Sequence, residues 1–289
     1  KLLCYLLILL AALVTSYGTV HGNEPLDVHG KLVNSTAGGP IPAGVSIAFH
    51  SEQIGASPGM IHSVTGKDGS FLFSGIEVHD DTLYGISAFY DGATYAKWID
   101  LKDSSPVEIK VYNSSDSDDI VTGFNASILF TAADPITRYL SIMEMITLTN
   151  ETDLTYVPGS EPMDLLRFGL PIDAEGLVVD TGIPGADWLQ VDRGFALIAS
   201  LPPGRHDLMF TYRVPYSGSS FSYQKTWRYG AESLRIVVPK GMSNINIDID
   251  HEIRVLDIDN QKYDVVESVG LERGKACLLY TSPSPRDRG

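Results

Sequence analysis

The segment V-E-I-K-V, residues 107–111, alternates apolar and charged side chains. Successive side chains of a β-strand point to opposite faces of a sheet, so this pattern predicts a strand with one buried face. No segment of convincing length has the period of a helix. Other short runs of alternating or β-branched residues precede the quoted segment, at residues 28–33, 45–50, 70–73, 83–90 and 95–101.

Turn residues separate these runs, notably Lys67-Asp68-Gly69 and Asp91-Gly92. Asp68 and Gly69 are expected to form a tight hairpin, because both central residues of a type I′ turn need positive φ. Similar runs continue along the chain, and many short strands with turns between them favour a β-sandwich. The later runs lie at residues 124–130, 139–150, 165–169, 177–180, 194–200, 206–216, 233–238 and 245–249.

The first part of the chain resembles a known family. Its motifs are D-V-H-G-K-L-V-N (27–34), G-G-P-I-P-A-G-V-S-I-A-F (38–49) and T-G-K-D-G-S-F-L-F (65–73). In this order they resemble the carboxypeptidase regulatory-like, prealbumin-type sandwich, although Gly66 stands where that family usually has Asp. The resemblance covers residues 26–113 and implies a fold, while the function of such modules varies from spacer to sugar binder.

A polar run, N-S-S-D-S-D-D at residues 113–119, follows and reads as a linker or exposed loop. Two later phrases, L-R-F-G-L-P-I-D-A-E-G-L (166–177) and L-P-P-G-R-H-D-L-M-F-T-Y-R-V-P-Y (201–216), place strands beside Pro/Gly turns. They resemble an uncharacterised β domain of bacterial cell-surface proteins, which often precedes a membrane helix. No activity is implied by this second resemblance.

Both ends of the sequence read as segments outside the fold. Residues 1–22 combine a basic start, an apolar run and small residues, which predicts a secretory signal peptide, with an uncleaved anchor as the alternative. Residues 277–289 begin with C-L-L-Y-T-S-P-S-P-R-D, which resembles a translated sequencing adaptor. The two cysteines, Cys4 and Cys277, lie in these segments, so no disulfide is expected in the mature chain.

The predicted fold is therefore all-β, with two β-sandwich domains of Ig-like or prealbumin-like type in series after a signal peptide. A length of 289 residues suits two domains. The expected division is signal peptide 1–22, first sandwich 23–113, linker 114–119, second sandwich 120–251, start of a truncated β segment 252–276 and adaptor 277–289.

The charge of the chain argues against nucleic-acid binding, and its motifs argue against catalysis. The chain has 36 Asp and Glu but only 21 Lys and Arg, a net charge of −15, whereas nucleic-acid binding requires clustered cations. The sequence has no H-E-x-x-H, G-x-S-x-G, P-loop or G-x-G-x-x-G pattern. No catalytic, cofactor-binding or metal-ligating residue is predicted, and the chain is not expected to be an enzyme.

Aromatic residues give the one candidate site. Tyr90, Tyr95 and Trp98 cluster around the Asp91-Gly92 turn, and a second group follows residue 220. Aromatic rings bind the flat faces of sugars, but they also form ordinary sandwich cores. The three named residues are predicted as ligand contacts, with core packing as the alternative.

The predicted function is that of an exported cell-surface binding or structural module, secreted or anchored to the membrane by a helix beyond residue 276. Its partner would be a cell-surface glycan or protein. Two alternatives stay open. In the first alternative, the chain is the accessory region of a secreted hydrolase or peptidase. In the second, it is a carbohydrate-binding module.

Overall fold

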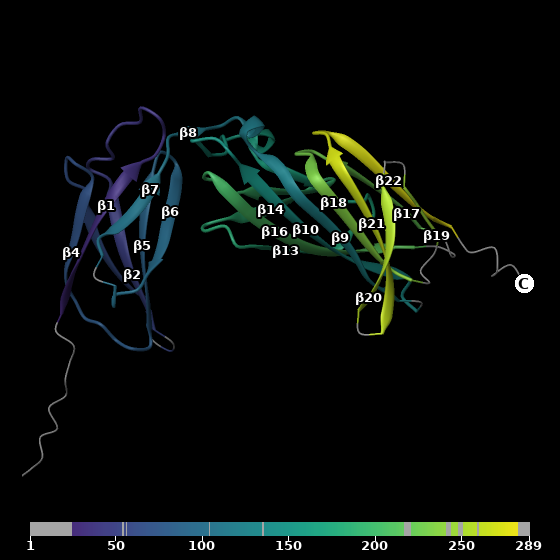
Figure 1. The fold of residues 1–289 in the computed structure, drawn as a ribbon, viewed down its shortest axis with the longest axis horizontal. Coiled ribbons are helices and arrows are strands. Elements are labelled where there is room, and N and C mark those ends of the chain that lie inside the picture. The colour runs from purple at the N-terminus through teal and green to yellow at the C-terminus, as the bar shows by residue number, and fades with distance from the viewer. Residues whose placement is uncertain are drawn as a thin grey trace, which may run out of the picture.

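The computed structural model describes residues 25–53, 55, 57–103, 105–134, 136–216, 221–240, 244–247, 251–258 and 260–282. About two thirds of the described residues are in strands, arranged as two sandwiches that lie one after the other, as Figure 1 shows. The all-β fold class is confirmed. The predicted signal peptide at 1–22 lies outside the described residues. Within the described part, no helix is long and apolar enough to cross a bilayer.

The first sandwich has two sheets that enclose one apolar core. One sheet has the order β4-β1-β7 and the other β3-β2-β5-β6. Alternating burial explains the core, since Ile47 and Phe49 of β2 and Ile86 of β5 point inward and are almost fully buried. The strands are β1 (Leu26–Asn34), β2 (Ser46–Gln53), β3 (Gly59–Val64), β4 (Ser70–Ile76), β5 (Thr82–Tyr90), β6 (Ala93–Ile99) and β7 (Val107–Val111).

The predicted hairpin at Asp68 and Gly69 is wrong. The strands on either side of it, β3 and β4, belong to different sheets, so the turn carries the chain across the sandwich. Gly69 alone of the two has positive φ, at 83°. The two-residue hairpin is at Asp91 (φ 46°) and Gly92 (φ 84°), which join the antiparallel strands β5 and β6.

The second sandwich is built on a seven-stranded sheet of order β13-β16-β10-β9-β18-β21-β20. Two three-stranded sheets, β12-β15-β14 and β17-β22-β19, complete it. Its longer strands are β9 (Thr122–Asp134), β10 (Tyr139–Asn150), β16 (Gly204–Pro215), β18 (Ala231–Pro239) and β21 (Gln261–Leu271). The shorter ones are β12 (Leu166–Gly169), β13 (Glu175–Thr181), β14 (Asp187–Val191), β15 (Gly194–Ile198), β17 (Phe221–Trp227), β19 (Asn244–Ile247), β20 (Glu252–Ile258) and β22 (Lys275–Ser282).

The end of the chain differs from the predicted division. β20 and β21 pair within the seven-stranded sheet, so residues 252–271 add to the second sandwich instead of opening a further segment. β22 pairs with β17 and includes residues 277–282 of the predicted adaptor. The adaptor itself stays a prediction.

The segment between the sandwiches is structured. β8 (Ser114–Ser115) pairs in parallel with β11 (Thr155–Tyr156), and a short 3-10 helix (Asp118–Ile120) follows. Asp118 forms ion pairs with Arg228 (3.0 Å) and Arg273 (2.7 Å). Residues 114–119 thus connect the sandwiches, but they are tied to the second one by backbone and charged contacts.

Further hydrogen bonds hold the sandwiches together at this junction. The hydroxyl of Thr36 donates to the backbone oxygen of Asp153 (2.6 Å), and the amide of Ala37 donates to the Asp153 carboxylate (2.8 Å). Val157 of the second region packs against the core of the first. The junction is therefore a packed interface as well as a covalent link.

Replacing Tyr95 by Phe is expected to weaken this junction. The Tyr95 hydroxyl contacts the Thr155 hydroxyl at 2.7 Å and donates to the carbonyl of Tyr112 at 3.1 Å. Losing one such buried group costs about 1 kcal/mol of unfolding free energy. Urea denaturation measures the loss, and small-angle scattering measures the added freedom between the sandwiches. Tyr263→Phe on β21 is the control, and equal effects from both variants would contradict the assignment.

Candidate functional site

The structure does not bring Tyr90, Tyr95 and Trp98 together on one surface. All three lie on the β5–β6 hairpin, but alternate residues of a strand face opposite sides of the sheet. Tyr95 points into the core and is 6% exposed, whereas Trp98 points outward and is 67% exposed. Of the three, Trp98 alone presents most of its ring to solvent.

Tyr90 and Tyr95 serve the junction. Asn34 donates a hydrogen bond to the Tyr90 hydroxyl at 3.1 Å, and Tyr95 reaches Thr155 of the second region. Burial raises the pKa of the Tyr95 hydroxyl still further above neutral pH, so this group remains protonated and able to donate. The contacts of Tyr90 and Tyr95 in the structure are within the protein. Their role as ligand contacts stays a prediction.

Trp98 packs against β5 at a position where its neighbour is a glycine. Gly85 pairs with Trp98, and a Cβ added to Gly85 would meet the indole Cε3 at 3.2 Å. The missing side chain leaves room for the indole beside β5, and most of the Trp98 side chain stays exposed. The result is an exposed aromatic side chain on the edge strand β6.

Trp98 belongs to a face of the four-stranded sheet that exposes other apolar side chains. The register places Met60, His50, Gly85 and Trp98 in one row across β3, β2, β5 and β6. We call this surface the Trp98 face. Its exposed large apolar side chains are Met60, Val64, Leu83, Phe89 and Trp98.

Polar groups lie among these apolar ones. His50 Nε2 and Ser87 Oγ are 2.7 Å apart, and Ser87 follows the Gly85 position on the same face of β5. Thr94 and Glu52 pair with Phe89 and Leu83 in the register. The Trp98 face therefore offers hydrogen-bonding groups beside its aromatic surface.

A second group of interest is buried in the other sandwich. Glu144 of β10 and Lys225 of β17 form an ion pair of 2.6 Å, with side chains 0% and 3% exposed. Tyr212 and Tyr223 donate hydrogen bonds to Glu144 Oε1 at 2.7 and 2.9 Å. Burial, followed by the charge of Glu144, raises the pKa of Tyr212 well above its usual range, so the hydroxyl remains a donor.

Sequence reasoning missed this group, although a signal was present. Glu144 stands in the apolar phase of the strand, between the buried Ile142 and Ile146. Lys225 likewise shares the phase of the buried Tyr223 and Trp227. A charge in the buried phase of an alternating strand requires a buried partner.

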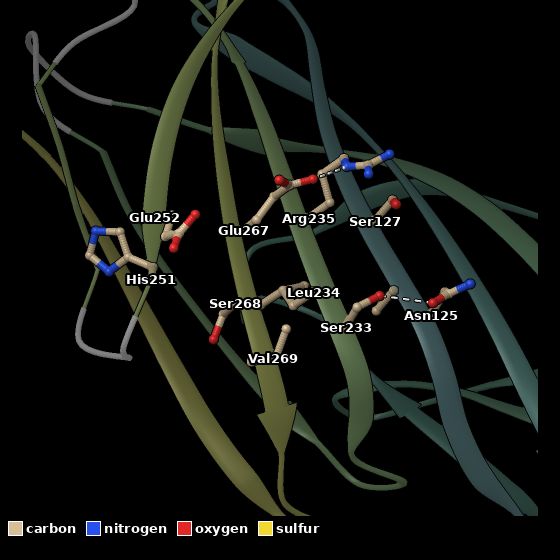
Figure 2. Close-up of a pocket in the computed structure, with 11 residues that line it drawn as sticks. Asn125, Ser127, Ser233, Leu234, Arg235, His251, Glu252, Glu267, Ser268 and Val269 are labelled. Carbon is tan, nitrogen blue, oxygen red and sulfur yellow. Dashed lines mark hydrogen bonds and ion pairs between the residues drawn. The ribbon is translucent and has the colours of Figure 1, made fainter.

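A polar depression of about 640 Å³ lies on the outer face of β9, β18 and β21, shown in Figure 2. Arg235 Nε donates to Glu267 Oε1 at 2.9 Å, and Ser233 donates to Asn125 at 2.8 Å. Both interactions cross between strands inside the depression. Arg235 and Glu267 of its lining are paired with each other, and Glu252 adds a second carboxylate.

The second aromatic group noted in the sequence is part of the core. Tyr223, Trp227 and Tyr229 are each at most 5% exposed and belong to the main apolar cluster of the second sandwich. Core packing is the observed role of these rings. Within the described residues, no three His, Cys, Asp or Glu side chains are close enough to hold a metal ion.

No family model and no curated protein matches the chain. Among solved structures, an M1 zinc metallopeptidase from Deinococcus radiodurans shares 11% identity over 56% of this chain and 42% of its own, with a TM-score of 0.38. This chain thus spans less than half of that enzyme. A DUF3823 family protein from Parabacteroides merdae shares 12% identity, with a TM-score of 0.25. The match covers 70% of this chain and 90% of that protein.

The RrgB pilus protein from Streptococcus pneumoniae also shares 12% identity, with a TM-score of 0.22 and coverage of 91% of this chain and 62% of its own. These scores are too low to assign a function. The resemblance of residues 26–113 to the carboxypeptidase regulatory-like sandwich stays a prediction.

Proposed function

We propose that this chain is a non-catalytic binding module that works outside the cell and contacts a polysaccharide through the Trp98 face. The observation that carries the proposal is the indole of Trp98, which is 67% exposed on β6 beside other exposed apolar side chains. An export signal predicted at 1–22 supports an extracytoplasmic location. The same role would serve a surface protein or an accessory region of a secreted hydrolase.

The chemistry of the Trp98 face suits a sugar. The apolar C–H face of a pyranose packs on an aromatic ring, while its hydroxyls need hydrogen-bond partners at the edge. Trp98 supplies the ring, and His50 and Ser87 lie on the same face as hydrogen-bonding groups. Because the indole packs beside Gly85, part of its conformational freedom is already lost before a ligand arrives, which reduces the entropy cost of binding.

Replacing Trp98 by Ala is expected to weaken polysaccharide binding by about tenfold or more, since a tenfold change is about 1.4 kcal/mol and a stacked ring contributes an amount of this order. The fold is expected to persist, because the side chain is mostly exposed. Affinity electrophoresis in gels that contain cellulose derivatives, xylan, mannan or peptidoglycan fragments measures the effect.

Two variants complete this experiment. Trp98→Phe retains a flat ring and is expected to keep most of the affinity. Ile136→Ala removes an apolar side chain that is 91% exposed in the second sandwich, and is expected to change nothing. Failure of the wild type to bind any of these polysaccharides, or unchanged binding by Trp98→Ala, would contradict the proposal.

A further inference from the structure

The buried ion pair of Glu144 and Lys225 is enclosed by aromatic rings and by a backbone carbonyl. Lys225 Nζ lies 5.1 Å from the centre of the Phe210 ring and 5.2 Å from that of Trp227, and its amine donates to the carbonyl of Gly169 at 3.1 Å. Both side chains are almost completely removed from water. Separate charges are disfavoured in such surroundings, because burial penalises the charged form of each group.

The two oxygens of the Glu144 carboxylate are held differently. Oε1 accepts hydrogen bonds from the hydroxyls of Tyr212 and Tyr223. Among the described residues, Oε2 has no hydrogen-bond partner, because its 2.6 Å contact with Lys225 Nζ does not have the angles of a hydrogen bond. The amine therefore contacts the one oxygen that nothing else holds.

We infer that Lys225 and Glu144 condense to an internal amide, which links β17 covalently to β10. The bond that forms joins Lys225 Nζ to Glu144 Cδ, and the bond that breaks is Cδ–Oε2. Two of the three protons of the ammonium group leave with Oε2 as water, and one remains on the amide nitrogen. No oxidant, reductant or other reactant is needed.

The surroundings favour each part of this step. Transfer of one proton from the ammonium group to the carboxylate gives the neutral amine that attacks Cδ and the neutral acid that loses water. The two tyrosine hydroxyls point at Oε1, where negative charge develops when the amine attacks Cδ, so they act as fixed donors to that oxygen. The residues are already in contact, which removes the entropy cost of bringing them together.

The product keeps every hydrogen bond of the site. Oε1 becomes the amide oxygen and still accepts from Tyr212 and Tyr223. The uncondensed amine donates to the carbonyl of Gly169, and we expect the remaining N–H of the amide to keep this partner. The oxygen that leaves is the one without a hydrogen bond, so condensation replaces a buried ion pair by a neutral, fully bonded amide.

Mass spectrometry of the folded, purified chain tests the inference. After incubation at neutral pH and denaturation, the wild type is expected to be lighter than its sequence by one water. A tryptic digest is expected to contain a branched peptide that joins the Glu144 and Lys225 segments, without cleavage after Lys225. The control is the double variant Glu144→Leu/Lys225→Met, which keeps the site filled and apolar and is expected to have its full sequence mass.

Two results would overturn the inference. One is a folded wild type of full mass that trypsin cleaves after Lys225. The other is a deficit of one water that persists in the double variant, because the water would then come from another site. The wild-type measurement stands by itself even if a variant fails to fold, and it does not depend on whether the Trp98 face binds a polysaccharide.

Discussion

Replacing Glu144 by Ala is expected to destabilise the second sandwich by about 3–5 kcal/mol relative to the uncondensed wild type, the range observed when one partner of a buried ion pair is removed. The substitution leaves the Lys225 amine buried beside two aromatic rings without its carboxylate. It also removes the acceptor of Tyr212 and Tyr223. Urea denaturation followed by tryptophan fluorescence measures the loss, since Trp227 lies in the same core.

Two variants separate the ion pair from the volume of the side chain. Glu151→Ala removes an exposed carboxylate at the end of the same strand and is expected to change stability by less than about 0.5 kcal/mol. Glu144→Leu/Lys225→Met replaces both charges by apolar groups and is expected to recover much of the loss. A Glu144→Ala variant as stable as Glu151→Ala would show that the buried pair contributes little.

Replacing Gly194 by Ala is expected to cost about 2–4 kcal/mol, because backbone strain and overpacking each contribute in the range of 1–3 kcal/mol. Gly194 has φ 142°, a conformation that side chains rarely adopt. An added Cβ would overlap the carbonyl oxygen of Phe168 on the paired strand β12. The strand carrying Phe195 and Leu197 would then have to move away from its partner.

The matched control is Gly182→Ala. Gly182 has no atom within 4 Å of its added Cβ and no positive φ, so Ala is expected to be neutral there. Thermal unfolding of the two variants compares the positions directly. A Gly194→Ala protein that melts with the control would mean that β12 and β15 can separate without loss of the core.

Alternation of apolar and polar residues in the sequence was sufficient to predict many strands. The prediction failed for strands that do not have one buried and one exposed face. The run at 139–150 matches β10 because a long strand with one buried face must alternate. β3 (Gly59–Val64) was missed because it lies at a sheet edge, where Met60, Ile61 and Val64 are all exposed and no alternation results. Turn residues likewise cannot show whether the next strand stays in the same sheet. For this reason the hairpin predicted at Asp68-Gly69 was wrong.

The candidate site was only partly accessible from sequence. Tyr95 and Trp98 are three residues apart, so strand geometry alone places them on opposite faces, and applying that rule would have separated them. That Gly85 lies beneath Trp98 depends on the register of β5 against β6, which the sequence does not encode locally. Glu144 could have been noticed within its strand, but its partner is 81 positions away and needs the tertiary fold.

The junction has a mechanical consequence. A pull that separates the two sandwiches is borne by the peptide at residues 113–114 and, in parallel, by the contacts of Thr36 and Ala37 with Asp153 and of Tyr95 with Thr155. These hydrogen bonds share the load, so they must break together before the two bodies can pivot. The chain therefore transmits force as a stiff rod up to that threshold, and as a hinged pair above it.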